Sequence, residues 1–207
     1  MKKPLAALGA TLLISTSSLA LAAGTAELAV VGSITPSACG VLISSGGMVD
    51  FGRMSSKTLN DDQPTPLPRQ TLHLSVRCEG ATFFTLSTID NRAGSSAHHD
   101  NWHGLGMTPS SEKIGGAYFG LHASVADGAS VRTLVSWDNG GTWQLGNGLG
   151  PTTLTAIETD PGTMQPGAVA EFDAEIGLYT HIAPAASLTL TDEVPVDGHA
   201  TVQLKYL

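Results

Sequence analysis

The sequence is poor in charged residues, aromatic residues and cysteine. Charged residues make up 14% of the 207 positions, aromatic residues make up 5%, and there are only two cysteines. The charged fraction lies well below the roughly 25% of an ordinary globular protein. The chain has ten basic and 18 acidic residues, and after the first three positions no two basic residues are adjacent. No basic stripe is therefore available to neutralise a phosphate backbone, and we expect no nucleic-acid partner.

Motifs of common catalytic sites are also missing. The sequence has no G-x-S-x-G nucleophile turn, no H-E-x-x-H metal motif, no phosphate-binding loop and no dinucleotide fingerprint. Its acidic residues are typical of solvated surface, and we interpret Glu171, Asp173 and Glu175 as the polar face of one strand, guarding it against wrong edge pairing. We therefore predict no catalytic residues, no metal site and no cofactor, and expect that the protein is not an enzyme.

Glycine and proline are plentiful, with 24 and 11 residues, and divide the sequence into short segments. Three segments alternate polar and apolar residues with the period of two typical of a half-buried strand, namely residues 71–78, 172–179 and 200–206. Turn-forming clusters lie at residues 60–64, 138–141, 146–148 and 160–162. No window after residue 22 holds a helical period for more than about two turns. The sequence therefore predicts an all-β fold, an antiparallel β-sandwich.

The first 22 residues have the pattern of a secretory signal peptide. Lys2 and Lys3 precede an apolar run over residues 5–21, which ends in the small-x-small sequence Ala20-Leu21-Ala22. A membrane anchor is the alternative, but hydroxyl residues at 11 and 15–18 interrupt a stretch that is already short for spanning a bilayer. We predict cleavage after Ala22, which leaves 8 basic and 18 acidic residues and no later segment that could span a membrane.

The two cysteines of the exported chain are Cys39 and Cys78. An even number of cysteines in an oxidising compartment favours a disulfide bond between them. Such a bond closes a loop of about 40 residues and is worth about 4 kcal/mol in the chain-entropy model. The alternative, half of a metal site, lacks a matching pair of cysteine or histidine ligands.

A further alternating segment precedes Cys39. Leu28, Val30, Gly32 and Ile34 fall on one face of a predicted strand, which Pro36 ends. This strand is either the first strand of the sandwich itself or a strand that serves another molecule. The residues of the segment alone do not decide between these interpretations.

Four stretches of this chain resemble chaperone–usher fimbrial subunits, the pilins of Gram-negative bacteria. Val30-x-Gly32-x-Ile34 ahead of Cys39 resembles their N-terminal extension, and Val49-Asp50-Phe51-Gly52 resembles the motif after their first cysteine. Residues 72–78 resemble the strand with the second cysteine, and residues 198–207 resemble the terminal strand with its penultimate tyrosine. Residues 91–150 are longer and richer in glycine than in simple shaft subunits, and resemble the larger beta-fimbriae major subunit group.

The resemblance implies an immunoglobulin-like sandwich that lacks its last strand. Residues 1–22 are then the signal peptide, 23–35 a donor-strand extension and 36–207 the pilin-like sandwich domain. The donor strand would bury Leu28, Val30, Gly32 and Ile34 in the groove of a neighbouring subunit, where the three larger side chains contribute about 1.5–3 kcal/mol each. The wall of the acceptor groove, which is also the chaperone-binding strand, would carry Ala200, Val202, Leu204 and Tyr206.

The resemblance also implies partners and a location. The partners are a periplasmic pilus chaperone, an outer-membrane usher and neighbouring fimbrial subunits joined head to tail. The protein would pass through the periplasm to the cell surface and become part of an extracellular fimbrium that contributes to adhesion. A secreted carbohydrate-binding β-sandwich that folds alone is the main alternative, with Trp102, Trp137 or Trp143 on its sugar-binding face.

Residues 136–143, Ser-Trp-Asp-Asn-Gly-Gly-Thr-Trp, match the Asp-box pattern of sialidase-type propellers. The motif occurs once, and a propeller needs several copies. We therefore predict a β-hairpin with a turn at Asn139-Gly140. Exposed Trp137 or Trp143 could alternatively stack on a sugar.

Residues 98–103, His-His-Asp-Asn-Trp-His, invite a metal hypothesis or a hydrolase hypothesis based on His103. A metal triad needs imidazoles that converge from ordered elements. The surrounding serine, asparagine and glycine residues favour a solvated loop instead.

Overall fold

The structure, a computed structural model, describes residues 38–207. These residues belong to one compact unit, Thr35–Leu207. The predicted signal peptide (residues 1–22) and donor-strand extension (residues 23–35), with Leu28, Val30, Gly32 and Ile34, lie outside the described residues.

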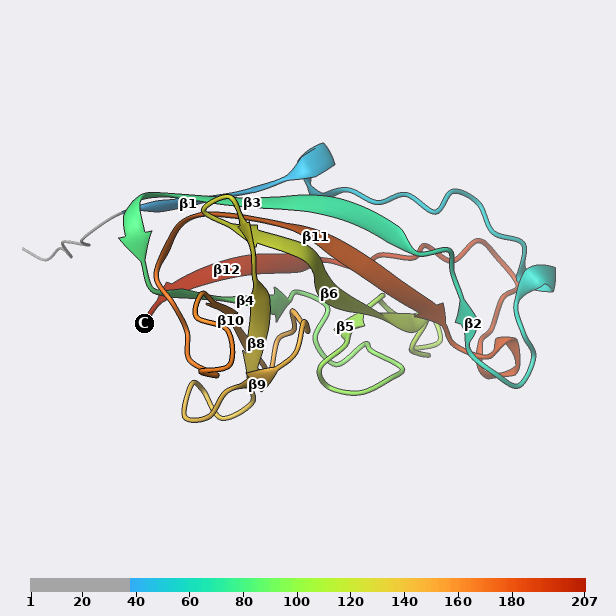
Figure 1. Cartoon of the computed structure of the whole chain (residues 1–207). Helices are drawn as coiled ribbons and strands as arrows, with labels where there is room; N and C mark the ends of the chain where they lie inside the picture. Colours follow the sequence, from blue (N-terminus) through green and yellow to red (C-terminus); the bar gives the residue numbers. More distant parts are fainter. Residues whose placement is uncertain (1–37) are drawn as a thin grey trace, which may run out of the picture. The chain divides into compact units, whose positions relative to one another are not determined.

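Two antiparallel sheets make up the fold, as predicted (Figure 1). The first sheet has the strand order β1-β3-β11-β6-β5, with β2 beside β11 and β7 beside β6. Its strands are β1 Cys39–Ile43, β2 Thr65–Pro66, β3 Gln70–Thr82, β5 His103–Gly104, β6 Gly115–Ala126, β7 Ala129–Ser130 and β11 Val169–Ile182. The second sheet has the order β12-β4-β10-β8-β9. Its strands are β4 Phe84–Asp90, β8 Arg132–Ser136, β9 Gln144–Leu145, β10 Leu154–Glu158 and β12 Ala200–Tyr206.

Helical structure among residues 38–207 is confined to three short 3-10 segments. They are η1 Ser44–Gly47, η2 Ser56–Thr58 and η3 Ala185–Ser187. No helix in this part of the chain is long and apolar enough to cross a membrane.

The three alternating segments of the sequence form three of the main strands. Residues 71–78 lie in β3, residues 172–179 lie in β11, and residues 200–206 are β12. The period of two works because successive side chains of a strand point to opposite faces, so the apolar set faces the other sheet. On β3, Leu74 and Val76 are buried while His73 and Arg77 are exposed. The strand predictions are confirmed.

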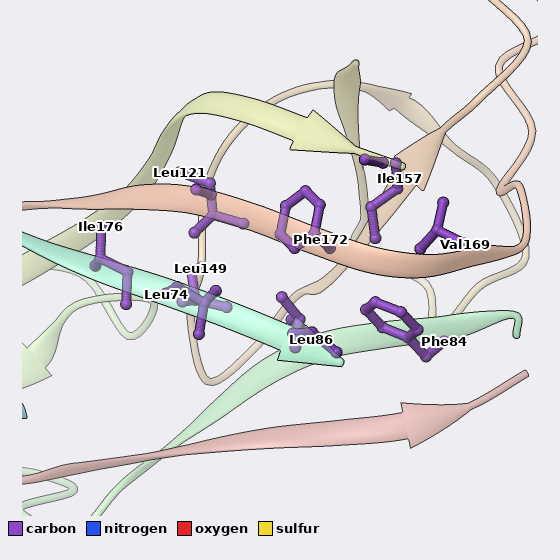
Figure 2. Close-up of a cluster of buried hydrophobic side chains, with 12 residues drawn as sticks. Leu74, Phe84, Leu86, Leu121, Leu149, Ile157, Val169, Phe172 and Ile176 are labelled. Atoms are coloured by element: carbon purple, nitrogen blue, oxygen red, sulfur yellow. The ribbon is translucent and has the colours of Figure 1, made fainter. Parts of the chain in front are cut away.

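The main hydrophobic core lies between the two sheets (Figure 2). The first sheet contributes Leu74 from β3, Leu121 from β6 and Phe172 from β11. The second contributes Leu86 from β4 and Ile157 from β10, and all five side chains are nearly fully buried. A smaller second cluster of Leu105, Ile114, Ala117 and Ile182 packs against partly buried Leu59, Leu67, Phe119, Leu188 and Val194.

The acidic residues of β11 have a different role from the one expected. β11 pairs with β3 on one side and β6 on the other, so it is a central strand and has no edge for Glu171, Asp173 and Glu175 to guard. Arg77 donates hydrogen bonds to both carboxylate oxygens of Asp173, at 3.0 and 2.9 Å. The edge-guarding interpretation is therefore wrong, and Asp173 helps to join β11 to β3 instead.

The burial of Phe172 in the main core predicts how much this side chain contributes to the free energy of unfolding. Replacing Phe172, which is completely buried, by alanine (Phe172→Ala) should lower the free energy of unfolding by about 3–5 kcal/mol, because apolar burial is lost and a cavity remains. Phe83→Ala is the matched control, since Phe83 is 50% exposed and such a substitution should change stability by about 0.5 kcal/mol or less. Denaturant unfolding of both variants measures the difference, and equal effects would contradict the assignment of this core.

Candidate functional site

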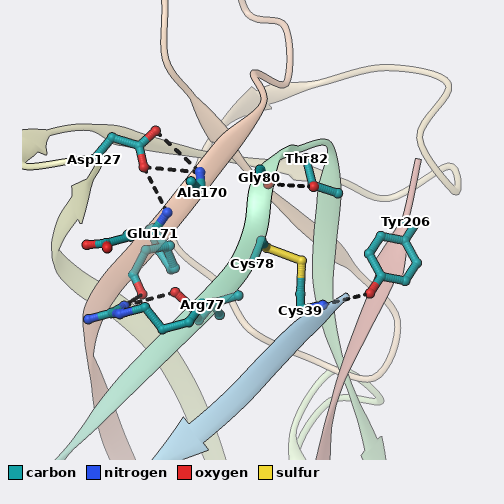
Figure 3. The surroundings of a disulfide bond; sticks show 11 residues. Cys39, Arg77, Cys78, Gly80, Thr82, Asp127, Ala170, Glu171 and Tyr206 are labelled. Atoms are coloured by element: carbon teal, nitrogen blue, oxygen red, sulfur yellow. Dashed lines mark hydrogen bonds between the residues drawn. A yellow bond between two sulfur atoms is a disulfide. The ribbon is translucent and has the colours of Figure 1, made fainter. Parts of the chain in front are cut away.

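The disulfide bond lies at one end of the sandwich. Cys39 of β1 is opposite Cys78 of β3 in the strand register, and the two residues are bonded, as predicted. The backbone N–H of Cys39 turns away from β3 and donates a hydrogen bond to the hydroxyl oxygen of Tyr206 at 3.0 Å (Figure 3). The start of β1 and the end of β12, which belong to different sheets, are therefore neighbours.

β12 has one paired edge and one unpaired edge. Among residues 38–207 it pairs only with β4. The N–H of Leu207 donates to the carbonyl of Phe83, and the N–H of Asn91 donates to the carbonyl of His199. Because hydrogen-bonded pairs alternate along an antiparallel ladder, the odd-numbered residues of β12 bond to β4. The even-numbered residues direct their backbone N–H and C=O groups to the unpaired edge.

β1 has the same arrangement at the edge of the other sheet. Its only strand partner in the described part of the chain is β3. The N–H of Glu79 donates to the carbonyl of Ala38, so the even-numbered residues around β1 bond to β3. Cys39, Val41 and Ile43 direct their backbone polar groups away from the sheet, as the hydrogen bond from Cys39 to Tyr206 shows.

The residues whose backbone groups have no strand partner within the described part of the chain are also the ones whose side chains point inward. Val41 and Ile43 of β1 and Val202 and Leu204 of β12 pack against the main core, but all four are only partly buried. Tyr206 is 44% exposed. We call this set the open edge: Cys39, Val41 and Ile43 on β1, and Ala200, Val202, Leu204 and Tyr206 on β12. It combines apolar side chains with main-chain groups that have no strand partner within residues 38–207, and of these the Cys39 N–H is bonded to the Tyr206 hydroxyl.

A pocket of about 570 Å³ adjoins the open edge. Its walls include the segment that follows β1, residues 47–54, and the segment that precedes β12, residues 190–198. Leu105, Ile114 and Ile182 of the second hydrophobic cluster also line it. The pocket therefore continues the open edge toward the far end of the sandwich.

The Val49-Asp50-Phe51-Gly52 motif lines this pocket. Asp50 accepts a hydrogen bond from the N–H of Gly52 at 2.7 Å, and Gly52 has a φ of 65°. Glycine suits this position because other residues are strained at a positive φ. The motif thus turns the chain so that Val49 and Phe51 reach the pocket.

The structure places every predicted groove residue of β12 at the open edge, namely Ala200, Val202, Leu204 and Tyr206. The sequence analysis missed Val41 and Ile43 on the opposite side. The signal was present, because Cys39, Val41 and Ile43 alternate with period two directly after the first cysteine.

The Asp-box-like segment forms the predicted hairpin. β8 pairs with β9, and Asn139 and Gly140 at the tip have positive φ angles of 57° and 93°. Asp138 accepts hydrogen bonds from the Ser136 hydroxyl, the Thr142 N–H and the Thr142 hydroxyl at 2.7–2.8 Å. These bonds from Thr142 and Ser136 lower the pKa of Asp138 to about 2. The carboxylate therefore holds the hairpin tip in one shape.

Residues 98–102 of the histidine cluster lie in a loop, as predicted, with His99 and Asp100 exposed, but His103 does not. His103 lies in β5 and is only 1% exposed, and its ring stacks on Phe119 with 4.1 Å between ring centroids. Its Nδ1 lies 3.2 Å from the carbonyl of Ala117 and must carry the proton, so Nε2 accepts from the Thr88 hydroxyl at 2.7 Å. The solvated-loop interpretation is wrong for His103, because its ring has partners in both sheets and no ligand-facing position.

Buried charge elsewhere also has a structural explanation. Glu158 of β10 is buried and accepts hydrogen bonds from the N–H groups of Gly162 and Met164, while Arg132 lies 2.6 Å from its second oxygen. Burial raises the pKa of Glu158. The hydrogen bonds from these three donors lower it by a larger amount, so the pKa lies below its ordinary value. Glu158 therefore fixes the predicted turn at residues 160–162.

Within residues 38–207 no three histidine, cysteine or acidic side chains form a metal-ligand group.

Comparison with known proteins gives two matches. A family described as "Protein of unknown function (DUF1120)" matches residues 28–103 of the chain. The chain is also similar to Protein GltF of Escherichia coli (strain K12), with 25% identity over 223 aligned residues that cover 87% of this chain and 88% of that protein. The family match includes both cysteines and β1. Neither description says what these proteins bind or assemble with.

His103 makes stability depend on pH. Burial lowers its pKa, although the Ala117 carbonyl and Asp90 oppose the shift. The unfolded side chain, with a pKa near 6.5, takes up a proton that the folded one resists. Stability should therefore be complete above about pH 6.5 and fall as the pH drops from there toward the lowered folded pKa.

Thermal unfolding between about pH 7 and 5 checks this expectation. His103→Gln should flatten the dependence of the midpoint on pH, whereas His99→Gln, at an exposed position, should leave it unchanged. Burial lowers the pKa of His98 and His122 as well, so part of the slope should remain. An unchanged slope in His103→Gln would contradict the expectation.

Asp138→Ala should loosen the hairpin tip. The Thr142 amide then loses its acceptor and should exchange its hydrogen faster, while the midpoint of thermal unfolding changes little because the tip is exposed. In the native chain this protection should persist above about pH 4 and disappear as the pH falls through about 2. Asp160→Ala, at another turn, is the control. Unchanged exchange at Thr142 in Asp138→Ala would show that the carboxylate does not hold the tip.

Proposed function

We propose that this protein is a structural subunit of a surface fimbria that polymerises by donor-strand complementation. In this proposal the described sandwich is the incomplete immunoglobulin-like fold of a pilin, and residues 23–35 of one copy complete the sandwich of the next. Such a subunit is an assembly component and has no catalytic role. The open edge is the observation that carries the proposal.

The open edge has the chemistry that an added strand requires. Extended peptides bind a sheet edge through main-chain hydrogen bonds and through pockets for alternate side chains. Val41, Ile43, Val202 and Leu204 offer partly buried apolar surface, and the backbone groups of the same residues have no strand partner within residues 38–207. Two strand spacings, roughly 9–10 Å, must separate β1 from β12 for one strand to fit. The contact through the Tyr206 side chain, in place of a backbone ladder, is compatible with such a separation.

The segment ahead of Cys39 has the matching pattern. Leu28, Val30 and Ile34 alternate with polar or small residues, so one face can fill the open edge while the backbone pairs with it. Each main-chain hydrogen bond adds about 1 kcal/mol net. The donor-strand extension and the open edge are different surfaces of the same chain. The contact between two copies is therefore head to tail and propagates as an open fibre.

The proposal includes the route to the fibre. A periplasmic chaperone would supply the first strand to the open edge, and an outer-membrane usher would allow the extension of a neighbouring subunit to replace it. The finished protein would then be extracellular, in a fimbrium that contributes to adhesion. An unpaired apolar edge is an aggregation hazard, which is a physical reason for a chaperone.

The test uses the exported chain with its own extension disabled. In the variant Leu28→Asp/Val30→Asp/Ile34→Asp, charged side chains face the apolar edge, so the chain should no longer form fibres. Adding a synthetic peptide of residues 23–35 should stabilise the variant by mass action, by about 2.7 kcal/mol at a hundredfold excess over Kd. This corresponds to roughly 5–10 °C in the thermal midpoint for a chain of this size.

Two controls make the test specific. Adding Leu204→Asp at the open edge should remove the effect of the peptide, whereas Thr201→Asp, on the exposed outer face of β12, should leave it intact. A peptide with the same composition in scrambled order should have no effect. If the native peptide does not raise the midpoint and the unmodified chain forms no polymer, donor-strand complementation is wrong.

A further inference from the structure

We propose that a pocket on the outer face of the second sheet binds an uncharged saccharide. The pocket has a volume of about 650 Å³, and its lining includes Ser87, Asp100, Lys113, Trp137, Gln203 and Lys205. We call it the outer-face pocket. It has no role in the proposed strand exchange, and the inference does not rest on that function.

Three strands of the second sheet bring four of these residues together, while Asp100 and Lys113 come from the chain between β4 and β6. Gln203 and Lys205 come from β12, Ser87 comes from β4, and Trp137 directly follows β8. In the order β12-β4-β10-β8 this span covers three strand spacings, roughly 14 Å. The hollow is therefore long enough for an extended, flexible ligand and is too open for a small buried cofactor.

Ser87 provides the sharpest evidence for a ligand. Its side chain is only 4% exposed, lines the outer-face pocket, and has a hydroxyl with no hydrogen-bond partner in the described structure. Buried hydroxyl groups are nearly always hydrogen-bonded, since an unmade bond costs about 1–3 kcal/mol. Ser87 lies opposite Gln203 in the strand register, so the Ser87 hydroxyl and the Gln203 amide belong to the same face of the sheet. A ligand hydroxyl in the pocket can satisfy both groups.

Trp137 provides an apolar platform at the other side of the pocket. It is 56% exposed, although an indole of this size is normally largely buried. The hydrogen bonds of Asp138 hold the hairpin that carries it, so its position is fixed before a ligand arrives. A flat aromatic face beside hydroxyl and amide groups suits a sugar ring, which has an apolar face of C–H groups and a rim of hydroxyl groups.

The charges of the pocket favour an uncharged ligand. Lys113 and Lys205 face Asp90 and Asp100 around the same hollow, so the lining has no excess of either sign. Asp90 is already engaged, because its two carboxylate oxygens accept the N–H groups of Arg92 and Gly104. An anionic glycan would need an excess of basic groups, which the lining lacks.

Binding of glycans to the whole exported chain tests the proposal. The native protein is screened on an array of neutral and anionic glycans, and a retained neutral glycan is then titrated by calorimetry. We expect Trp137→Ala to weaken binding by about tenfold or more, since hot-spot aromatic residues dominate such contacts. Gln203→Ala should weaken binding as well. Trp137 is exposed and Gln203 is partly buried on the outer face, outside the hydrophobic core, so both substitutions should change the thermal midpoint little.

Phe83→Ala is the matched control, because Phe83 is an equally exposed aromatic residue outside the pocket. It should bind like the native chain. The affinity of the native chain should also change little between about 0.05 and 0.5 M salt, since no ion pair with the ligand is involved. The proposal is overturned if the native chain retains no glycan, if only anionic glycans bind, or if Trp137→Ala and Gln203→Ala bind as tightly as the native chain.

Discussion

The described structure depends on one constraint, the pairing of the backbone along the outer edges of β1 and β12, for which residues 38–207 supply no strand. Each is the edge strand of its own sheet, and on each strand the residues with free N–H and C=O groups also point their side chains into the core. Natural proteins normally protect such edges with charge, proline or a covering segment. Here the edge residues Val41, Ile43, Val202 and Leu204 are apolar, so within residues 38–207 this edge has none of these protections.

The disulfide bond and Tyr206 set one limit of this edge. Cys39 is bonded to Cys78, which fixes β1 to the first sheet, and its N–H reaches the Tyr206 hydroxyl at the end of the second. At this end the two sheets are therefore held at a defined separation. At the other end the segments that flank β1 and β12 diverge around the pocket that contains Val49 and Phe51. The separation of the sheets is thus a property of residues far apart in sequence.

Local pattern was sufficient to predict β3, β11, β12 and the disulfide bond. β3, β11 and β12 are long enough to show a period of two, and the turn at Asn139-Gly140 has a local cause in its positive φ angles. β5, β7 and β9 have two residues each and show no period, so these three strands could not be predicted from the sequence. His103 was misinterpreted for this reason, since its burial comes from Thr88 and Phe119 and not from its sequence neighbours.

The order of the strands in each sheet could not be predicted from the sequence either. Ser75 donates a hydrogen bond to Asp173, 98 residues away, and this pairing makes β11 a central strand. A single polar face looks the same on a central and on an edge strand, which is why Asp173 was assigned to an edge. The groove residues of β12 could be named from the alternation alone. That these residues have no second strand partner within residues 38–207 could not be predicted from the sequence, because it depends on where β1 lies.

β12 shows how one strand can take part in two independent interactions. Its even-numbered residues, such as Val202 and Leu204, face the core and the open edge, while Gln203 and Lys205 face the outer-face pocket. The period of two therefore separates the surface proposed for strand addition from the surface proposed for a ligand. An added strand would extend the edge without covering the outer face. In a head-to-tail fibre every copy would keep its pocket exposed, and many weak sites on one fibre bind a surface far more strongly than one site alone.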